Sequence, residues 1–311
     1  MIIKASSKPE SLHRLQRLVI RSHDPSPYLQ EVRNRELGYK FESELQFYLN
    51  RILHLFHPIP FVILYDLRIP LGNSSFQIDC LLLTPNFGLI IETKGASGTL
   101  SFSHNAHFFH YDKGEMSNPI AQAEEQRDQL LKVLQLDDYP IQYVVGLGHP
   151  NVFLSTDESS EWIREIVVPF NLLKNVIKKL FEKYDTQKFE KEKLIKIGFY
   201  LKANHQEERI FFNIDSSSIE PGVICPECLR LKMIRYKYKW HCHHCGGTSV
   251  DAHYQDILDW FSFINRKKIS NRECRTFLQI SNPSTSFNIL RNCVLLEARG
   301  INRGRYYVLK D

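Results

Sequence analysis

Three ionisable residues stand close together in an apolar stretch of the 311-residue chain: Asp79 in FQIDCLLLT, and Glu92 and Lys94 in FGLIIETK. Two carboxylates on one face can hold a hard divalent cation such as magnesium. Such a cation polarises a phosphate oxygen and activates bound water, while a lysine ammonium stabilises charge on the reacting oxygens. The pattern therefore indicates phosphodiester hydrolysis. The alternative is a salt bridge between Asp79 and Lys94 at a strand end, with Glu92 in solvent.

This chemistry requires the three side chains to share one face of a hairpin. If a tight turn is centred on Asn86 and Phe87, Asp79 lies opposite Lys94. Directly opposed residues share a face, and so do residues two apart on one strand. We therefore predict Asp79, Glu92 and Lys94 on one side of the hairpin. The other side is expected to hold the apolar set Ile78, Cys80, Leu82, Leu89 and Ile91.

Helical and extended patterns alternate over residues 31–184, which predicts an α/β domain with a mixed sheet. The first helix is expected over residues 31–55, with Leu37, Phe41, Leu45, Leu49, Ile52 and Leu53 on its apolar face. Expected strands are 61–69, 76–84, 87–94, 141–149, 152–155 and 164–169, and expected helices are 117–136 and 171–184. A charged helical run follows, and RIFFNID at 209–215 is expected as a last strand.

Four short runs appear in a fixed order along this domain: GYKFE, QID, IETKG and NPIAQAEEQRDQL. Their order and intervals resemble the nuclease-related domain (NERD) family over residues 35–180. The resemblance implies a core similar to the restriction-endonuclease-like PD-(D/E)xK fold, a mixed sheet flanked by helices. It also implies a metal-dependent nuclease in which Asp79 and Glu92 bind magnesium or manganese and Lys94 is the catalytic lysine.

The same resemblance adds three further site residues. Glu42 takes the place of the acid of the first helix, and Gln77 and Gln122 take the places of supporting polar groups. The family usually has a glycine immediately before the first-helix acid, where this chain has Phe41, so Glu44 is the alternative to Glu42. An exposed carboxylate on the helix surface is the other interpretation of Glu42.

Two CxxC pairs with thirteen residues between them predict a tetrahedral zinc site in a zinc ribbon. The four ligands are Cys225, Cys228, Cys242 and Cys245. The alternatives are redox-active thiols, or one of His241, His243 and His244 in place of a cysteine. A module of about 30 residues buries too little surface to fold alone, so the zinc is expected to be structural. The other cysteines, Cys80, Cys274 and Cys293, are expected in the core.

The last sixty residues read as helix, helix, turn, helix and hairpin, the order of a winged helix. A capping pattern begins the second helix at Ser270 or Asn271. Residues expected to face nucleic acid are Ser284, Thr285, Asn288, Arg291 and Asn292 on the third helix, and Arg299, Arg303 and Arg305 around the hairpin loop. A protein-interaction module of the same shape is the alternative.

Charge is divided unevenly along the chain. Residues 1–219 carry 25 Lys and Arg against 27 Asp and Glu, and residues 220–311 carry 15 against 8. A positive excess confined to one end favours a polyanion, and nucleic acid is the commonest. We therefore expect a nuclease acting on nucleic acid, with DNA the favoured substrate. The rival hypothesis is a non-catalytic DNA-binding or regulatory protein that keeps a nuclease-like scaffold.

Composition and organisation complete these expectations. Hydrophobic residues make up 43% and charged residues 24%, as in ordinary globular proteins. The start of the chain lacks an apolar signal region and charges interrupt every apolar run, so we expect a non-secreted cytoplasmic protein without membrane spans. The expected division is an N-terminal helical extension (1–34), the NERD domain (35–185), a connecting segment (186–219), the zinc ribbon (220–250) and the winged-helix-like module (251–311).

Overall fold

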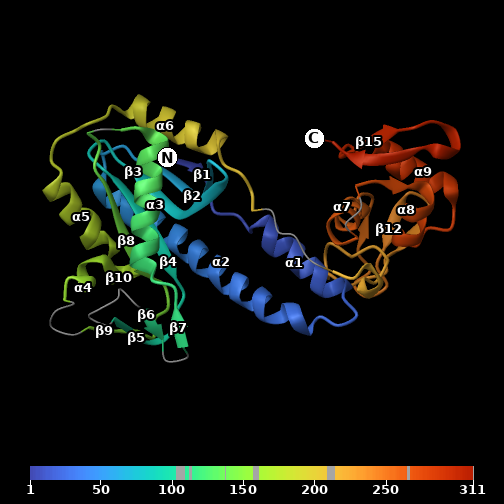
Figure 1. The fold of residues 1–311 in the computed structure, drawn as a ribbon, viewed down its shortest axis with the longest axis horizontal. Coiled ribbons are helices and arrows are strands. Elements are labelled where there is room, and N and C mark those ends of the chain that lie inside the picture. Colours follow the sequence, from blue (N-terminus) through green and yellow to red (C-terminus); the bar gives the residue numbers. More distant parts are fainter. Residues whose placement is uncertain are drawn as a thin grey trace. The chain divides into compact units, whose positions relative to one another are not determined.

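The computed structural model describes residues 1–102, 109–111, 114–136, 138–156, 161–208, 214–264 and 267–310. The chain forms two compact units, and each draws on two separate stretches of sequence (Figure 1). The first unit contains Met1–Pro9 and Asn34–Glu208, and the second contains Glu10–Arg33 and Arg209–Asp311. The two units are described separately below.

A six-stranded mixed sheet forms the centre of the first unit. Its strand order is β1-β2-β3-β4-β8-β10, in which β3 is antiparallel to both β2 and β4 and the remaining neighbours are parallel. The strands are β1 (Ile2–Lys4), β2 (Val62–Leu71), β3 (Ser74–Leu83), β4 (Gly88–Lys94), β8 (Ile141–Leu147) and β10 (Val167–Pro169).

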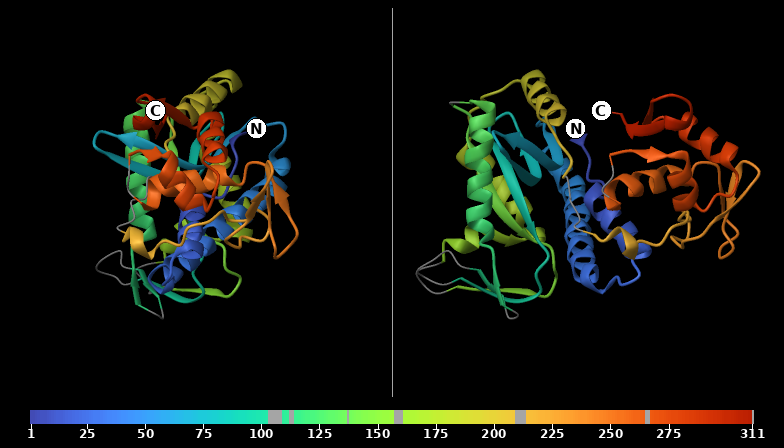
Figure 2. Two further views of the ribbon diagram at one scale, coloured as in Figure 1. Left: turned by 90° about the vertical axis from the view of Figure 1, so that its right-hand side faces the viewer. Right: turned by 45° about the vertical axis from the view of Figure 1, so that its right-hand side comes forward.

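Helices cover both faces of this sheet, as the right-hand view of Figure 2 shows for α2 and α3. On one face, α2 (Ser26–Ile52) and α5 (Leu173–Lys183) pack on a cluster that includes Ile63, Cys80 and Leu89. On the other, α3 (Pro119–Leu134) and α6 (Lys191–Ala203) pack on a cluster that includes Leu81 and Ile90. The expected mixed α/β sheet flanked by helices is therefore confirmed.

The helices begin where local sequence favours them, with small differences from expectation. Asn118 caps α3 by accepting hydrogen bonds from the backbone N–H groups of Ile120 and Ala121, and Pro119 occupies the first turn. Helix α2 begins before residue 31 and passes into a 3₁₀ turn at Leu53–Phe56. Leu37 is 45% exposed rather than inward, and between Val32 and Leu45 the helix α2 contributes no residue to the apolar clusters.

A smaller four-stranded sheet is also part of the first unit, and of its strands the sequence patterns predicted the one at residues 152–155. Its order is β7-β6-β5-β9, and its strands are β5 (Gly98–Phe102), β6 (Phe109–Tyr111), β7 (Gly114–Met116) and β9 (Val152–Ser155). The expected strand 164–169 is half wrong, because α4 (Ile163–Ile166) precedes the short strand β10. Most of the expected strand at 209–215 lies outside the described residues, and Ile214 and Asp215 are not in a strand.

The register of the β3–β4 hairpin differs from expectation by two residues. Cys80 pairs with Ile91 and Leu82 with Leu89, so Asp79 stands opposite Glu92 and not Lys94. The cause is Thr84, whose hydroxyl donates to the carbonyl oxygen of Phe87 and accepts from the backbone N–H of Asn86 and of Phe87. These bonds close the turn over residues 84–87, one residue earlier than the predicted turn.

The strict alternation of side chains also fails at the position of Asp79. Ile78 packs with Leu81 and Leu83, whereas Cys80 and Leu82 pack on the opposite face, so the prediction that Ile78 lies with Cys80 is wrong. The β2–β3 pairing is interrupted between Tyr65–Cys80 and Leu67–Ile78, and Asp66 at this interruption has a φ of +47°. This left-handed residue interrupts the pleat and lets the flanking residues change face.

In the second unit, a small three-stranded sheet precedes a helical module. The small sheet consists of β11 (Ile234–Tyr236), β12 (Lys239–His241) and β13 (Thr248–Ser249). The module runs through α7 (His253–Phe263), β14 (Ile269–Ser270), α8 (Asn271–Leu278), α9 (Pro283–Asn292), β15 (Leu296–Arg299) and β16 (Tyr306–Leu309). The strand order in its sheet is β14-β16-β15. The predicted capping box is present at the start of α8. The Ser270 side chain accepts from the backbone N–H of Glu273, and the Glu273 side chain accepts from the backbone N–H of Ser270.

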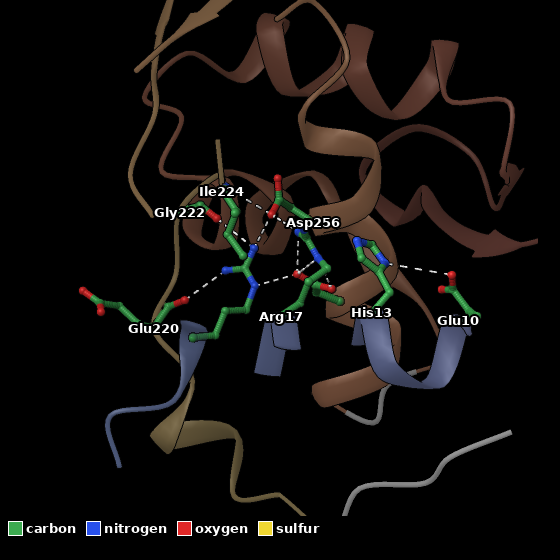
Figure 3. Close-up of polar contacts among 9 residues, drawn as sticks. Glu10, His13, Arg17, Glu220, Gly222, Ile224 and Asp256 are labelled. Atoms are coloured by element: carbon green, nitrogen blue, oxygen red, sulfur yellow. Dashed lines mark hydrogen bonds and ion pairs between the residues drawn. The ribbon is translucent and has the colours of Figure 1, made fainter. Parts of the chain in front are cut away.

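The N-terminal residues do not form a separate structure. Strand β1 pairs with β2, and α1 (Glu10–Arg21) packs against α7 in the second unit. Arg17 and Arg21 of α1 form ion pairs with Asp256 and Asp259 of α7 in the interior of this unit, as Figure 3 shows for Arg17 and Asp256. The second unit is thus built from both ends of the chain. Within the described residues, no helix is both long and apolar enough to cross a membrane.

Candidate functional site

Asp79 lies where the two central strands of the hairpin separate. The β3–β4 ladder ends at Cys80 and Ile91, and beyond it the Oδ2 atom of Asp79 accepts a hydrogen bond of 2.8 Å from the backbone N–H of Thr93. The carboxylate therefore takes the place of a strand carbonyl. This bond fixes the Asp79 side chain beside Glu92 and Lys94.

Glu92 is the most deeply buried member of the group, with 1% of its surface exposed. Its Oε1 atom lies 2.8 Å from Nζ of Lys94, and its Oε2 atom accepts a hydrogen bond of 2.8 Å from Nε2 of Gln126. Lys94 also donates to Oε1 of Gln122 at 3.1 Å. Lys94 is therefore held in place by Glu92 and by Gln122 of α3. The carboxylate that pairs with Lys94 is that of Glu92, and not that of Asp79.

Glu42 of α2 belongs to the same electrostatic group. Burial raises the pKa of Glu42 to about 7, and the negative charges of Asp66 and Glu92 add to the effect. The pKa of Asp79 is raised well above its ordinary value, first by burial and then by Glu92 and Glu42. Acids so close together in a poorly solvated place favour a bound cation or proton.

Phe41, immediately before Glu42, fills a space that two glycines leave open. A Cβ atom on Gly95 would lie 2.1 Å from the Phe41 ring, and one on Gly148 would lie 2.4 Å from it. Gly95 directly follows Lys94, so the ring packs α2 against the end of β4. The two glycines thus make room for Phe41 at the position where the family that the sequence resembles usually has a glycine.

One polar residue at the site, Gln126, and one beside it, Asp66, were not predicted from the sequence. Gln126 lies one helical turn after Gln122, and that spacing of four could have indicated it. Asp66 interrupts the apolar segment FVILYDLRI, and it is 7% exposed. It forms an ion pair of 3.5 Å with Lys4 and accepts a hydrogen bond of 2.9 Å from Gln77. Gln77 therefore contacts Asp66, and no hydrogen bond joins it to Glu92 or Lys94 among the described contacts.

The donor set fits a magnesium or manganese ion. Asp79 and Glu92 are oxygen donors whose mutual repulsion, to which Glu42 adds, a cation would relieve, as the raised pKa of Asp79 indicates. Within the described part of the chain, these acids do not form a closed set of ligand atoms like that of the cysteines below. Magnesium usually takes one or two protein carboxylates and completes its shell with water and phosphate oxygens, so an open set suits it.

The four predicted zinc ligands come together in the second unit. The Sγ atoms of Cys225, Cys228, Cys242 and Cys245 all lie within 4.8 Å of one another. Two of the separations are 3.7 Å (Cys225 to Cys245) and 3.5 Å (Cys228 to Cys242). Four sulfurs about 2.3 Å from a central zinc would be separated by about 3.8 Å in a tetrahedron, so the geometry fits. Cys80, Cys274 and Cys293 are buried in the core, as predicted.

The residues expected to face nucleic acid lie on α9 and the following hairpin. Ser284, Asn288 and Arg291 are exposed on α9, and Thr285 is half-buried. Arg299 forms an ion pair of 2.8 Å with Glu297, and the Arg305 guanidinium lies 5.8 Å from the centre of the Phe287 ring. The side chain of Arg303 lies outside the described part of the structure.

Comparison with known proteins supports the assignment of the first unit. Residues 37–147 match the family model of NERD, the nuclease-related domain. This segment includes Glu42, Asp79, Glu92 and Lys94. No curated protein matches the chain. A crystal structure of protein VC1899 from Vibrio cholerae aligns with 49% of this chain and 35% of its own, at 15% identity and a TM-score of 0.29. That likeness is too low to support an argument about fold or function.

Proposed function

We propose that this protein is a metal-dependent nuclease that hydrolyses phosphodiester bonds of nucleic acid, with DNA as the favoured substrate. The observation that carries the proposal is the group formed by Asp79, Glu92 and Lys94 at the end of a central hairpin, inside a segment that matches a nuclease-related domain. A structural salt bridge alone does not require a second acid and two glutamines around one buried Glu–Lys pair.

Each residue of the group has a definite role in this proposal. Asp79 and Glu92 would hold magnesium or manganese, which supplies charge neutralisation and an activated water when bound. Lys94, positioned by Glu92 and Gln122, donates hydrogen bonds to the phosphate oxygens that gain charge. Glu42, with a pKa of about 7, can accept a proton from the attacking water near neutral pH.

The second unit would supply affinity for nucleic acid. It carries 20 Lys and Arg against 12 Asp and Glu, whereas the first unit carries 20 against 23. The order α7, β14, α8, α9, β15 and β16, with β16 between β14 and β15, supports a winged helix. The cysteine cluster supports a zinc ribbon. A cytoplasmic location is part of the proposal, because zinc-binding thiols persist in a reducing compartment.

Incubation with defined substrates tests the reaction. Purified full-length protein would be given end-labelled single-stranded DNA, duplex DNA and RNA in magnesium, in manganese, and in neither. We expect cleavage with either metal, fastest on DNA. A chelator that strips zinc as well is unsuitable as the negative control, so metal-free buffer serves instead. Intact substrate under every condition would contradict the proposal and favour the non-catalytic alternative.

A charge-matched comparison tests the proposed binding role of the hairpin. Changing Arg299, Arg303 and Arg305 together to glutamine should weaken duplex binding for every sequence and flatten its salt dependence, because phosphate contacts release counterions. The control removes three exposed lysines of α5, Lys174, Lys178 and Lys179, in the same way. Equal affinity and equal salt slope in the arginine variant and the parent would exclude this role.

A further inference from the structure

The β11–β12 hairpin of the second unit leaves one of its faces uncovered. Its two strands pair Ile234 with His241, Arg235 with Trp240, and Tyr236 with Lys239, so Lys237 and Tyr238 form a two-residue turn. Directly opposed residues share a face. Ile234, Tyr236, Lys239 and His241 therefore form one face, and the edge of the Tyr236 ring meets the His241 ring at a centroid distance of 6.1 Å.

The exposed fractions show which face is packed. Trp240, on the inner face, is 1% exposed, and its Nε1–H donates a hydrogen bond of 3.0 Å to Nδ1 of His253 in α7. On the outer face and the turn, Ile234 is 54% exposed, and Tyr236 and Tyr238 are each 64% exposed. Large aromatic side chains that are this accessible in a small module indicate a surface that binds a partner molecule.

The charge around these tyrosines selects the kind of partner. Residues 229–241 contain five Lys and Arg and no Asp or Glu. The ammonium of Lys237 lies 5.4 Å from the centre of the Tyr236 ring, and that of Lys239 lies 5.7 Å from the centre of the Tyr238 ring. Among the described residues, neither lysine belongs to an ion pair. Alternating cations and exposed rings match a polyanion that also carries flat apolar groups.

Two features hold the hairpin in shape before any partner binds. Strand β12 leads directly into Cys242 of the cysteine cluster, and Trp240 anchors it to α7. Lys237 has a φ of +53°, in the left-handed region that favours glycine, and the turn nevertheless carries a cationic side chain there. A preformed surface binds without the entropic cost of ordering a loop.

We propose that this hairpin binds single-stranded nucleic acid, with unpaired bases stacked on Tyr236 and Tyr238 and backbone phosphates against Lys237 and Lys239. The proposal deepens the proposed function, on which it rests for the identity of the polymer as substrate. It assigns recognition of unpaired bases to β11–β12, which is separate from the α9 and hairpin-loop residues proposed to contact duplex. Duplex DNA keeps its base faces stacked inside the helix, so tyrosine stacking favours the single strand.

Binding measurements on the full-length protein test this directly. Fluorescence anisotropy would compare a labelled oligo-dT, an oligo-rU and a duplex of equal length, in magnesium-free buffer without chelator so that zinc stays bound and no cleavage occurs. The Y236A/Y238A variant should lose at least about tenfold in affinity for both single strands and less than about twofold for duplex. The matched Y236F/Y238F variant keeps both rings and should bind like the parent.

Lysine variants and a zinc measurement complete the test. Changing Lys237 and Lys239 to glutamine should reduce the slope of log affinity against log salt on oligo-dT, which the tyrosine variants leave unchanged. Zinc content equal to that of the parent shows that each variant keeps its fold. Unchanged oligo-dT affinity in Y236A/Y238A, or an equal loss on duplex, would overturn the proposal. Because binding is measured without cleavage, this result is independent of whether the protein proves to be a nuclease.

Discussion

The ammonium of Lys94 lies 2.8 Å from Oε1 of Glu92, two residues earlier in the same strand, and Gln126 donates to the other oxygen of that carboxylate. Both oxygens of the buried glutamate are thus fixed by protein groups, whereas Asp79 is fixed through one oxygen by the Thr93 N–H. These side-chain hydrogen bonds restrain the position of Lys94 relative to Asp79, in addition to the pairing of the strands.

Removal of the Gln126 amide should slow cleavage without abolishing metal binding. In Gln126→Leu the Oε2 atom of Glu92 loses its donor, and outer partners of this kind typically contribute about 10- to 100-fold to activity or metal affinity. Single-turnover cleavage rates measured against magnesium concentration would separate the two effects. Gln129→Leu is the control, because Gln129 is partly exposed on the same helix and bonds to Glu125 rather than to Glu92. Equal rates for Gln126→Leu and the parent would show that Gln126 plays no positioning role.

The sequence predicted the central strands of the main sheet better than their register. Apolar runs and turn residues located β2, β3 and β4, because burial on both faces demands such runs. The turn was misplaced by one residue, since the hydroxyl of Thr84 closes it in a way that hydrophobic periodicity does not report. The face change at Ile78 depends on the backbone of Asp66 in another strand, which no local pattern reveals.

Long-range partners were the other feature that the sequence could not supply. Gln126 was overlooked because a glutamine on a polar helix is ordinarily solvated. Helix α1 was expected as an extension, yet its Arg17 and Arg21 reach acids more than two hundred residues later in the chain. Such contacts depend on tertiary packing, and spacing within one segment carries no information about them.

Loss of Arg21 should strongly destabilise the second unit. This side chain is fully buried, pairs with Asp256 and Asp259, and donates to the carbonyl oxygens of Glu220 and Gly222. Arg21→Leu leaves Arg17 as the one partner of two buried carboxylates and removes the donors to two buried carbonyl oxygens, which costs about 3–5 kcal/mol in unfolding free energy. Urea unfolding followed by Trp240 and Trp260 fluorescence, in a Trp162→Phe background, would report this unit.

The matched control for Arg21 is Arg14→Leu on the same helix, where the arginine pairs with Glu10 in a partly exposed position. It should change the unfolding free energy by less than about 1 kcal/mol. By the same reasoning, a fragment of residues 220–311 lacks α1 and should be less stable than the same residues in the full chain. Similar midpoints for Arg21→Leu and Arg14→Leu would contradict the importance of the buried network.

Acidification should weaken the second unit through His253. Burial, assisted by the positive charge of Arg235, lowers the pKa of His253 to about 4. The unfolded state takes up the proton more readily, so this stability is complete above pH 6.5 and is lost as pH falls toward 4. Between pH 7.5 and 5 the loss should be about 2 kcal/mol.

Comparison with His253→Gln isolates the histidine, since glutamine can accept from the Trp240 indole without titrating. Urea unfolding at pH 7.5 and 5 should show the parent losing about 2 kcal/mol more than this variant. The zinc-binding thiols titrate alike in both proteins and cancel in the difference. Identical pH dependence in the two proteins would mean that His253 accepts a proton in the folded state.

The cysteine cluster should bind one zinc ion per chain. Elemental analysis of protein purified without chelator gives the stoichiometry, and Cys242→Ser should reduce both zinc content and the stability of the second unit. Cys80→Ala, in the core of the first unit, should keep its zinc. Protein that contains no zinc under these conditions would exclude the zinc assignment.

The most direct test of the whole account is the magnesium-dependent cleavage rate of Asp79→Asn. Asparagine has the shape of aspartate and its oxygen can still accept from the Thr93 N–H, so the variant should unfold at the same urea concentration as the parent or a higher one. It lacks the negative charge that the proposed metal requires. We predict a rate at least about 10³-fold below that of the parent. Cleavage at the parent rate by folded Asp79→Asn would contradict the assignment of this site as the active centre.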